Sequence, residues 1–303
     1  MIVQRILDQI KPSRGRGIVF AAGGSADIII AKTVAAGLVD QGCCHVDLAQ
    51  PLNCRVLSEK GLLSDAGEFY ALEHEDDLDP ESVLRHHASI PSDRHPDHRR
   101  GKGLSISSSL EWDHGSRYVC AAHGRGPSSL AGRRDRDEQY YDFAVGVDGG
   151  GDVLTRDDDE FDRVVVTGFR SGWSPAHPLL LITMGLGADG GSEPAEFSDV
   201  ALAGWTPVAN TSVDDAFGVT LHRELERLGL WHGDPSRWTS DDPCWGYGFK
   251  VPQIIALAVR NEFPFRAPGD QPDLVLFPRR GELKLMDKRL LCEARLFLSE
   301  GDR

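Results

Sequence analysis

The chain of 303 residues is 40% hydrophobic and 26% charged, an ordinary balance for a globular protein that buries a sizeable core. Its formal net charge of -14 argues against general nucleic-acid binding, because phosphate contacts require a basic surface. No apolar run approaches the roughly 20 residues that cross a bilayer. Of the six cysteines, Cys43 and Cys44 are adjacent and the other four are scattered, and none forms a Cys-x-x-Cys pair. We therefore expect a cytoplasmic protein with reduced thiols and no membrane contact.

The start of the chain predicts a strand, a glycine loop and a helix in succession. Apolar spacing indicates a short helix over residues 2–10, and residues 18–22 are typical of a buried strand. Residues 23–27 form the glycine loop, and the Ala-rich segment 28–39 is predicted to be helical. A strand over residues 45–49 follows at a distance that fits a parallel crossover connection.

The middle of the chain has a different composition. Residues 85–103 place four histidines among Arg, Pro, Ser and Asp and lack apolar periodicity, and residues 124–139 are again polar and Arg-rich. We interpret residues 85–138 as a polar insertion or long loop within a single α/β domain that covers residues 1–303. Two short runs inside this segment, 104–110 and 117–122, are predicted to be strands.

Regular patterning returns in the remainder of the chain. The predicted strands there are residues 143–148, 163–167, 179–184 and 274–277. The predicted helices are residues 194–203, 212–230, 251–263 and 283–299, the second with a capping box formed by Ser212 and Asp215. Because continuous apolar strands alternate with helical segments, we expect a mainly parallel sheet with helices on both faces.

Three of the predicted strands run into loops of glycine and aspartate, at residues 23–27, 148–152 and 185–191. In a parallel sheet all three loops lie at the carboxyl edge, where open α/β sheets bind ligands. The predicted ligand-binding residues are Gly23, Gly24, Ser25, Asp27, Gly149, Gly150, Gly151, Gly185, Gly187 and Gly190. The predicted catalytic and metal-binding residues are Asp148, Asp152 and Asp189. The alternative is that each loop is only a turn, since glycine and aspartate form turns well.

Carboxylates gathered in one crevice repel one another. Either one stays protonated, or a cation lies between them, or they hold hydroxyls or an amine of the ligand. A divalent cation such as Mg²⁺ is the most economical solution, and ligand hydroxyls are the second. Gly23, Gly24 and Ser25 are a candidate anion cradle, with Asp27 directed away as a helix cap. NAD is not expected, because Asp189 interrupts the only G-x-G-x-x-G match with negative charge.

Together the three loops resemble the domain-of-unknown-function family eleven fifty-two. The shared elements are Gly-Gly-x-x-Asp at residues 23–27, Asp-x-Gly-Gly-Asp at residues 148–152 and Gly-x-Gly-x-Asp-Gly at residues 185–190. The resemblance implies a Rossmann-like fold and carries no known reaction. The chain departs from the family pattern at Ser25, where a glycine is expected, and in having Gly191 and Ser192 before Glu193.

From these features we predict a hydrolase or group transferase rather than an oxidoreductase. Its ligand is expected to be a nucleotide-like or sugar-phosphate-like small molecule. The alternative is a non-catalytic ligand-binding or regulatory protein, which the departures from the family pattern favour.

Overall fold

The computed structural model describes residues 2–10, 15–22, 27–43, 45–52, 70–71, 118–122, 141–154, 161–173, 175–188, 202–227, 231, 251–267, 269, 271–279 and 282–300. The strands in these ranges are β1 (Arg16–Ala21), β2 (His45–Leu52), β3 (Tyr70–Ala71), β4 (Tyr118–Ala122), β5 (Phe143–Gly149), β6 (Leu179–Met184), β7 (Trp205–Ser212), β8 (Phe265–Arg266), β9 (Leu274–Arg279), β10 (Glu282–Asp287) and β11 (Glu293–Ser299). The helices are α1 (Ile2–Gln9), α2 (Asp27–Asp40), the short η3 (Asp152–Leu154), α5 (Phe161–Gly172), α6 (Asp215–Arg227), α8 (Val251–Arg260) and α9 (Lys288–Leu291).

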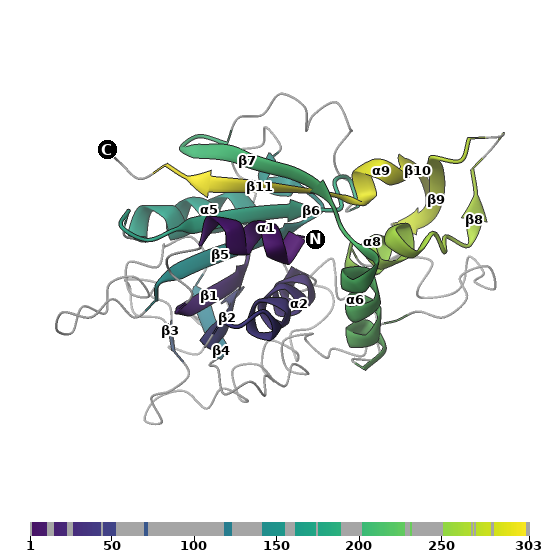
Figure 1. The fold of residues 1–303 in the computed structure, drawn as a ribbon. Coiled ribbons are helices and arrows are strands. Elements are labelled where there is room, and N and C mark those ends of the chain that lie inside the picture. The colour runs from purple at the N-terminus through teal and green to yellow at the C-terminus, as the bar shows by residue number, and fades with distance from the viewer. Residues whose placement is uncertain are drawn as a thin grey trace, which may run out of the picture.

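An eight-stranded sheet in the order β3-β4-β2-β1-β5-β6-β11-β7 forms the centre of the molecule (Figure 1). The neighbours from β4 to β6 are all parallel, whereas β3, β11 and β7 pair antiparallel at the two sides. The chain builds outward from β1 to β2 and β4, then returns to the centre and builds in the other direction through β5 and β6. The predicted mainly parallel sheet is therefore confirmed, and its strand order reverses between β1 and β5.

Side chains that alternate along the central strands enter two separate cores. On β5, Phe143, Val145 and Val147 face the core that contains α1, α2, α6 and α8. Ala144 faces the second core, in which α5 places Phe169. Helices thus lie on both faces of the sheet, with α1 and α2 in front of it in Figure 1.

The second core is centred on a stacked aromatic pair. Phe169 on α5 lies parallel to Phe20 on β1, with ring centroids 3.6 Å apart and an interplanar angle of 1°. Trp173 continues the row with its ring centroid 6.4 Å from that of Phe169. These contacts hold α5 against the sheet and fix where the first turn of α5 lies.

The predicted strand at residues 163–167 is wrong, because these residues belong to α5. Their run of valines has the composition of a strand, but the buried side chains around it follow a helical spacing. Asp162, Val166, Phe169 and Trp173 are all buried, at intervals of four, three and four residues. The helical period outweighs the β propensity of three valines because it gives α5 one continuous apolar face.

The predicted helix at residues 283–299 is also wrong. This segment contains β10, the single turn α9 and β11. Asp287 accepts a hydrogen bond from the backbone N–H of Arg289 and so caps α9, which interrupts the segment. In β11, Ala294 and Leu296 are buried at strand spacing between β6 and β7. Tertiary pairing on both sides decides the conformation of this segment.

The helices near residues 212–230 and 251–263 are confirmed as α6 and α8, with shorter bounds. The predicted capping box at Ser212 is wrong, because Ser212 ends β7 and pairs with Glu293. Asp214 caps α6 instead, and its side chain accepts from the backbone N–H of Phe217 at 3.1 Å. The edge strand β7, which contains Pro207, had no strand-like pattern and was not predicted.

The remaining predictions have mixed outcomes. The short strand near residues 117–122 is confirmed as β4, and it lies inside the predicted polar insertion. The predicted strand 104–110 and helix 194–203 lie outside the described residues. None of the described helices is long and apolar enough to cross a membrane. Cys43 is buried, and Cys292 is partly buried.

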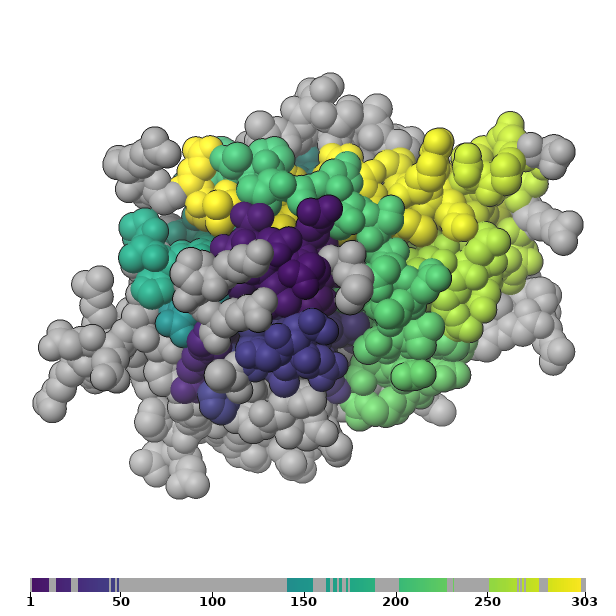
Figure 2. Space-filling view, in the orientation of Figure 1, coloured from purple at the N-terminus to yellow at the C-terminus, as the bar shows by residue number. Residues whose placement is uncertain are grey.

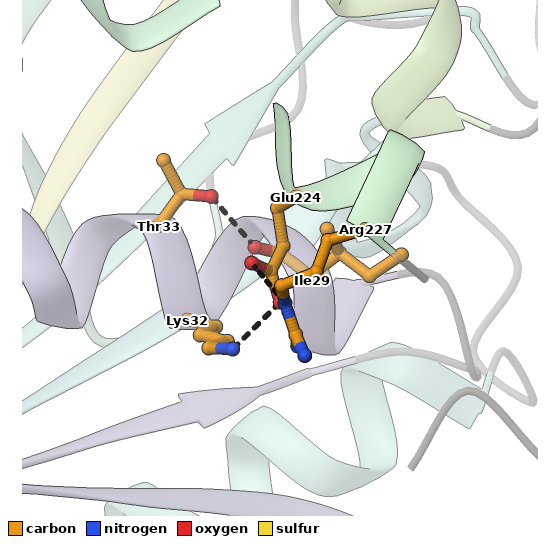
Figure 3. A network of polar contacts seen from close by, with 5 residues as sticks. All are labelled: Ile29, Lys32, Thr33, Glu224 and Arg227. Carbon is orange, nitrogen blue, oxygen red and sulfur yellow. Dashed lines mark hydrogen bonds and ion pairs between the residues drawn. The ribbon is translucent and has the colours of Figure 1, made fainter. Parts of the chain in front are cut away.

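An ionic network joins α2 to α6 on one face of the molecule, where α1, α2 and α6 lie side by side (Figure 2). Glu224 of α6 bonds Lys32 of α2 at 2.6 Å and Arg227 at 2.7 Å (Figure 3). Burial raises the pKa of Glu224, but the hydrogen bonds from Arg227 and Lys32 outweigh it and lower the pKa overall. The network links α6 to α2, whose first residue belongs to the candidate site.

Candidate functional site

The loops that follow β5 and β6 are joined by backbone hydrogen bonds. Gly150 donates its N–H to the carbonyl oxygen of Met184 at 2.8 Å, and Gly187 donates to the carbonyl oxygen of Gly150 at 2.7 Å. Gly150 and Gly187 have φ angles of 109° and 79°, which only glycine adopts readily. Two of the three loops predicted to form a site therefore lie side by side at the carboxyl edge of the sheet.

The first residue of α2, Asp27, also lies beside these loops. A Cβ atom on Gly149 would lie 2.7 Å from Oδ1 of Asp27 and 2.7 Å from Cδ1 of Ile30. A side chain at position 149 would have to displace the Asp27 and Ile30 side chains, so glycine suits this close approach of α2 to β5. The Asp27 side chain is thus directed toward the end of β5, and not away from the site as a cap.

Three aspartates from different elements form a buried group at this edge, which we call the aspartate cluster: Asp27 on α2, Asp148 on β5 and Asp162 on α5. One carboxylate oxygen from each lies within 4.8 Å of the others. Their side chains are almost fully enclosed, with exposures of 4% for Asp27, 0% for Asp148 and 6% for Asp162. The cluster lies where the strand order reverses between β1 and β5.

The cluster only partly matches the predicted site. Asp27 and Asp148 are brought together, while Asp152 begins η3 and lies outside the cluster, although its charge still acts on Asp148. Gly149, Gly150, Gly151, Gly185 and Gly187 are at the same edge, in or directly after β5 and β6. The other predicted residues, Gly23, Gly24, Ser25, Asp189 and Gly190, lie outside the described residues.

Asp162 was missed because its neighbours were interpreted as a strand. A strand over residues 163–167 would place Asp162 at the amino edge, away from the other carboxylates. A helix places it in the first turn of α5, at the carboxyl edge of the sheet. The apolar spacing of Val166, Phe169 and Trp173 was the available signal.

Repulsion and burial act together on Asp148. Burial raises its pKa well above the ordinary value, and the carboxylates of Asp162, Asp27 and Asp152 raise it further. Neither of its carboxylate oxygens has a hydrogen-bond partner among the described residues. A hydrogen bond between Asp148 and Asp162 exists only when one of them carries a proton, and it raises the pKa as well. The other two aspartates are in the first turns of α2 and α5, where the helix dipole favours negative charge.

Thr183 adds a hydroxyl group beside the cluster. It is the register partner of Asp148 in the parallel pair of β5 and β6, so both side chains leave the sheet on the same face. This is the α5 face, because Leu181, two residues earlier on β6, is part of the second core. Thr183 is fully buried, and its Oγ1 has no hydrogen-bond partner among the described residues. A buried hydroxyl without a partner is unfavourable unless something else binds it.

No family model matches the sequence, and no curated protein does, so the resemblance to family eleven fifty-two stays a prediction. Among solved structures, the glycopeptide N-methyltransferase MtfA complexed with sinefungin matches at 13% identity and a TM-score of 0.28, covering 72% of this chain and 79% of that one. The same enzyme complexed with (S)-adenosyl-L-methionine matches at 12% identity and a TM-score of 0.28, covering 99% and 92%. Similarity at this level carries no functional conclusion.

Proposed function

We propose that this chain is a Rossmann-like α/β enzyme, a hydrolase or group transferase, that acts on a nucleotide-like or sugar-phosphate-like small molecule. The observation that supports this most directly is the position of the aspartate cluster. It lies at the carboxyl ends of β1 and β5, where the strand order reverses. In open α/β sheets this is the general place for a ligand.

The chemistry of the site favours transfer of a charged group. Clustered carboxylates recruit a divalent cation, and such a cation neutralises phosphate oxygens and stabilises charge that develops during transfer. The backbone N–H groups at the starts of α2 and α5 supply positive potential near the same point. The predicted cradle at Gly23, Gly24 and Ser25 is assigned the anionic part of the ligand.

A ligand screen followed by turnover assays tests the proposal. Thermal unfolding of the full chain is measured with nucleotides, nucleosides and sugar phosphates, each with Mg²⁺ and with a chelator. We expect a phosphorylated ligand to raise the unfolding temperature more than the matching nucleoside does. Hits are then tested for hydrolysis and for transfer to water-soluble acceptors. If none of the phosphorylated ligands raises the unfolding temperature, the proposal is contradicted.

A non-catalytic ligand-binding or regulatory protein is the second candidate, and the burial of Asp148 favours it. A group that is 0% exposed does not reach a substrate without rearrangement of its surroundings. Stabilisation by a ligand without any turnover would support this candidate. Turnover that is lost in Asp148→Asn while the ligand still binds would reject it.

A further inference from the structure

We propose that Asp27, Asp148, Asp162 and Thr183 bind one hard divalent cation of the Mg²⁺ or Mn²⁺ class. This replaces the ligand set predicted from the sequence, Asp148, Asp152 and Asp189. The inference rests on the proposed function, because it assigns the cation of the same site. It goes further in naming the ligands, the kind of ion and the element that each ligand comes from.

The spacing of the carboxylates fits a single ion. Oxygen ligands lie about 2.0–2.6 Å from Mg²⁺ or Ca²⁺, so two ligands on opposite sides of the ion are about 4–5 Å apart. One oxygen each from Asp27, Asp148 and Asp162 lies within 4.8 Å of the others. The backbones of α2, β5 and α5 therefore need no rearrangement to bring all three oxygens onto one ion.

Thr183 is an independent indication that something polar belongs here. It is on β6, whereas the three aspartates come from α2, β5 and α5. Its fully buried Oγ1 and both oxygens of Asp148 have no hydrogen-bond partner among the described residues. These two side chains are neighbours on the same face of the sheet. A cation beside them would satisfy the orphaned oxygens of both residues at once.

A shared proton satisfies the group less well. One proton between Asp148 and Asp162 neutralises a single charge and leaves the Thr183 hydroxyl without a partner among the described residues. A divalent cation neutralises two charges and is large enough to contact several oxygens together. Ligand hydroxyls are a poor fit as well, because the three carboxylates are at most 6% exposed. A bare ion needs far less room than a sugar.

The donor set also selects the class of ion. All four groups offer oxygen, which suits Mg²⁺, Mn²⁺ and Ca²⁺. Zinc prefers nitrogen and sulfur ligands, so we expect it to bind this site more weakly than it binds its usual sites. The carboxylate spacing accommodates both the smaller and the larger oxygen-binding ions, so the test compares them.

Direct metal titration of the full chain tests the inference without any substrate. The probe is Mn²⁺, followed by electron paramagnetic resonance of the free ion, with Mg²⁺, Ca²⁺ and Zn²⁺ as competitors. We expect one tight site. Asp148→Asn and Asp162→Asn should each weaken it by about 100-fold, and Thr183→Val by about 10-fold, by analogy with groups that orient metal ligands. Asp40→Asn is the control, because Asp40 is exposed at the opposite end of α2.

Each result bears on the inference. Loss of Mn²⁺ binding in the cluster variants but not in Asp40→Asn would support it, provided that thermal unfolding in a chelator shows each variant to be folded. Equal effects in all variants would indicate surface binding to an acidic protein and overturn it. The absence of a tight Mn²⁺ site in the wild-type chain would also overturn it. Phosphorylated ligands that bind equally well in the chelator would leave the proposed function intact while the metal assignment fails.

Discussion

The backbone N–H of Gly187 donates to the carbonyl oxygen of Gly150 at 2.7 Å, which ties the loop after β6 to the loop after β5. The same edge receives the start of α2 against Gly149 and the first turn of α5 through Asp162. Parts of α2, α5 and the loops after β5 and β6 therefore lie together in one small region. Changes to that region should be measurable in both stability and ligand binding.

Enlarging Gly149 should displace α2. In Gly149→Ala the new Cβ would lie 2.7 Å from Asp27 Oδ1 and Ile30 Cδ1, and 3.1 Å from Val251 Cγ1. We expect a loss of about 1–3 kcal/mol in the free energy of unfolding, as for other overpacked sites. Urea denaturation measures it. Combining Gly149→Ala with Ile30→Val removes one of the clashing atoms, so the double variant should lose less than the sum of the two single changes. Additive losses would show that the Ile30 contact is unimportant.

Removing the charge of Asp148 should stabilise the metal-free protein at neutral pH. Its pKa is raised in the folded state by burial and by neighbouring carboxylates. Below the unfolded value of about 3.9 the carboxyl is protonated in both states and costs nothing. As pH rises toward the folded pKa, the unfolded chain releases the proton first, and stability falls. Asp148→Asn lacks this penalty.

The advantage of Asp148→Asn over wild type in a chelator should therefore grow as pH rises from about 4 to 8 and vanish at the acid end. Urea denaturation at several pH values measures it. An advantage that is independent of pH would show that charge repulsion is not the cause. A variant less stable than wild type at every pH would show that the Asp148 carboxylate is stabilised by its surroundings.

The network between α2 and α6 should lose strength in acid. The hydrogen bonds from Arg227 and Lys32 lower the pKa of Glu224 against the opposing effect of burial. A carboxylate with a lowered folded pKa contributes stability above its unfolded pKa, and this is lost as pH falls through the folded value. Glu224→Gln should thus cost about 0.5–1 kcal/mol at neutral pH and almost nothing once the pH has fallen through the folded pKa of Glu224.

The matched control for that experiment is Glu226→Gln. Glu226 is on the same helix, is 58% exposed and, within the described part of the chain, forms an ion pair with His222 at 3.4 Å. We expect little effect on the free energy of unfolding at either pH. If the two variants behave alike, the network in Figure 3 does not hold α6 against α2.

The cap of α6 gives a prediction that is independent of the site. Asp214 accepts a hydrogen bond from the backbone N–H of Phe217. Asp214→Ala should cost about 1 kcal/mol, whereas Asp214→Ser keeps an acceptor and should cost only a few tenths. Chemical denaturation of both variants checks this, and an equal loss in the two would assign the effect to something other than capping.

The parts of the fold that were predicted correctly rely on local pattern. The strands around β1, β5 and β6 are long apolar runs that end in glycine, and the parallel sheet follows from their alternation with helices. The parts that were missed depend on distant partners. β11 is a strand because β6 and β7 lie on either side of it, which its own sequence does not reveal. β7 is an edge strand with a mostly polar surface, so burial leaves little trace in its pattern.

The site shows the same division. Asp148 and Asp27 were predicted because each lies at the junction of an apolar element with a glycine loop. Asp162 does not lie at such a junction. The edge of the sheet at which it lies depends on whether the valines after it form a strand or a helix. One incorrect secondary-structure assignment was therefore enough to leave Asp162 out of the predicted site. Thr183 was not predicted, because only the register with Asp148 distinguishes it from other strand residues.

The antiparallel strand β11 is inserted between β6 and β7, and Gly185 donates its N–H to the carbonyl oxygen of Glu293 at that strand's start. Among the described strands of the large sheet, β11 is the last to leave the ribosome. During synthesis, the edges of β6 and β7 that pair with β11 therefore stay unpaired until β11 has been made, although the parallel strands before them are already complete. A nascent chain stalled before residue 293 would expose two strand edges that can pair with other chains. This stalled chain is the form of the protein that should depend most on chaperones.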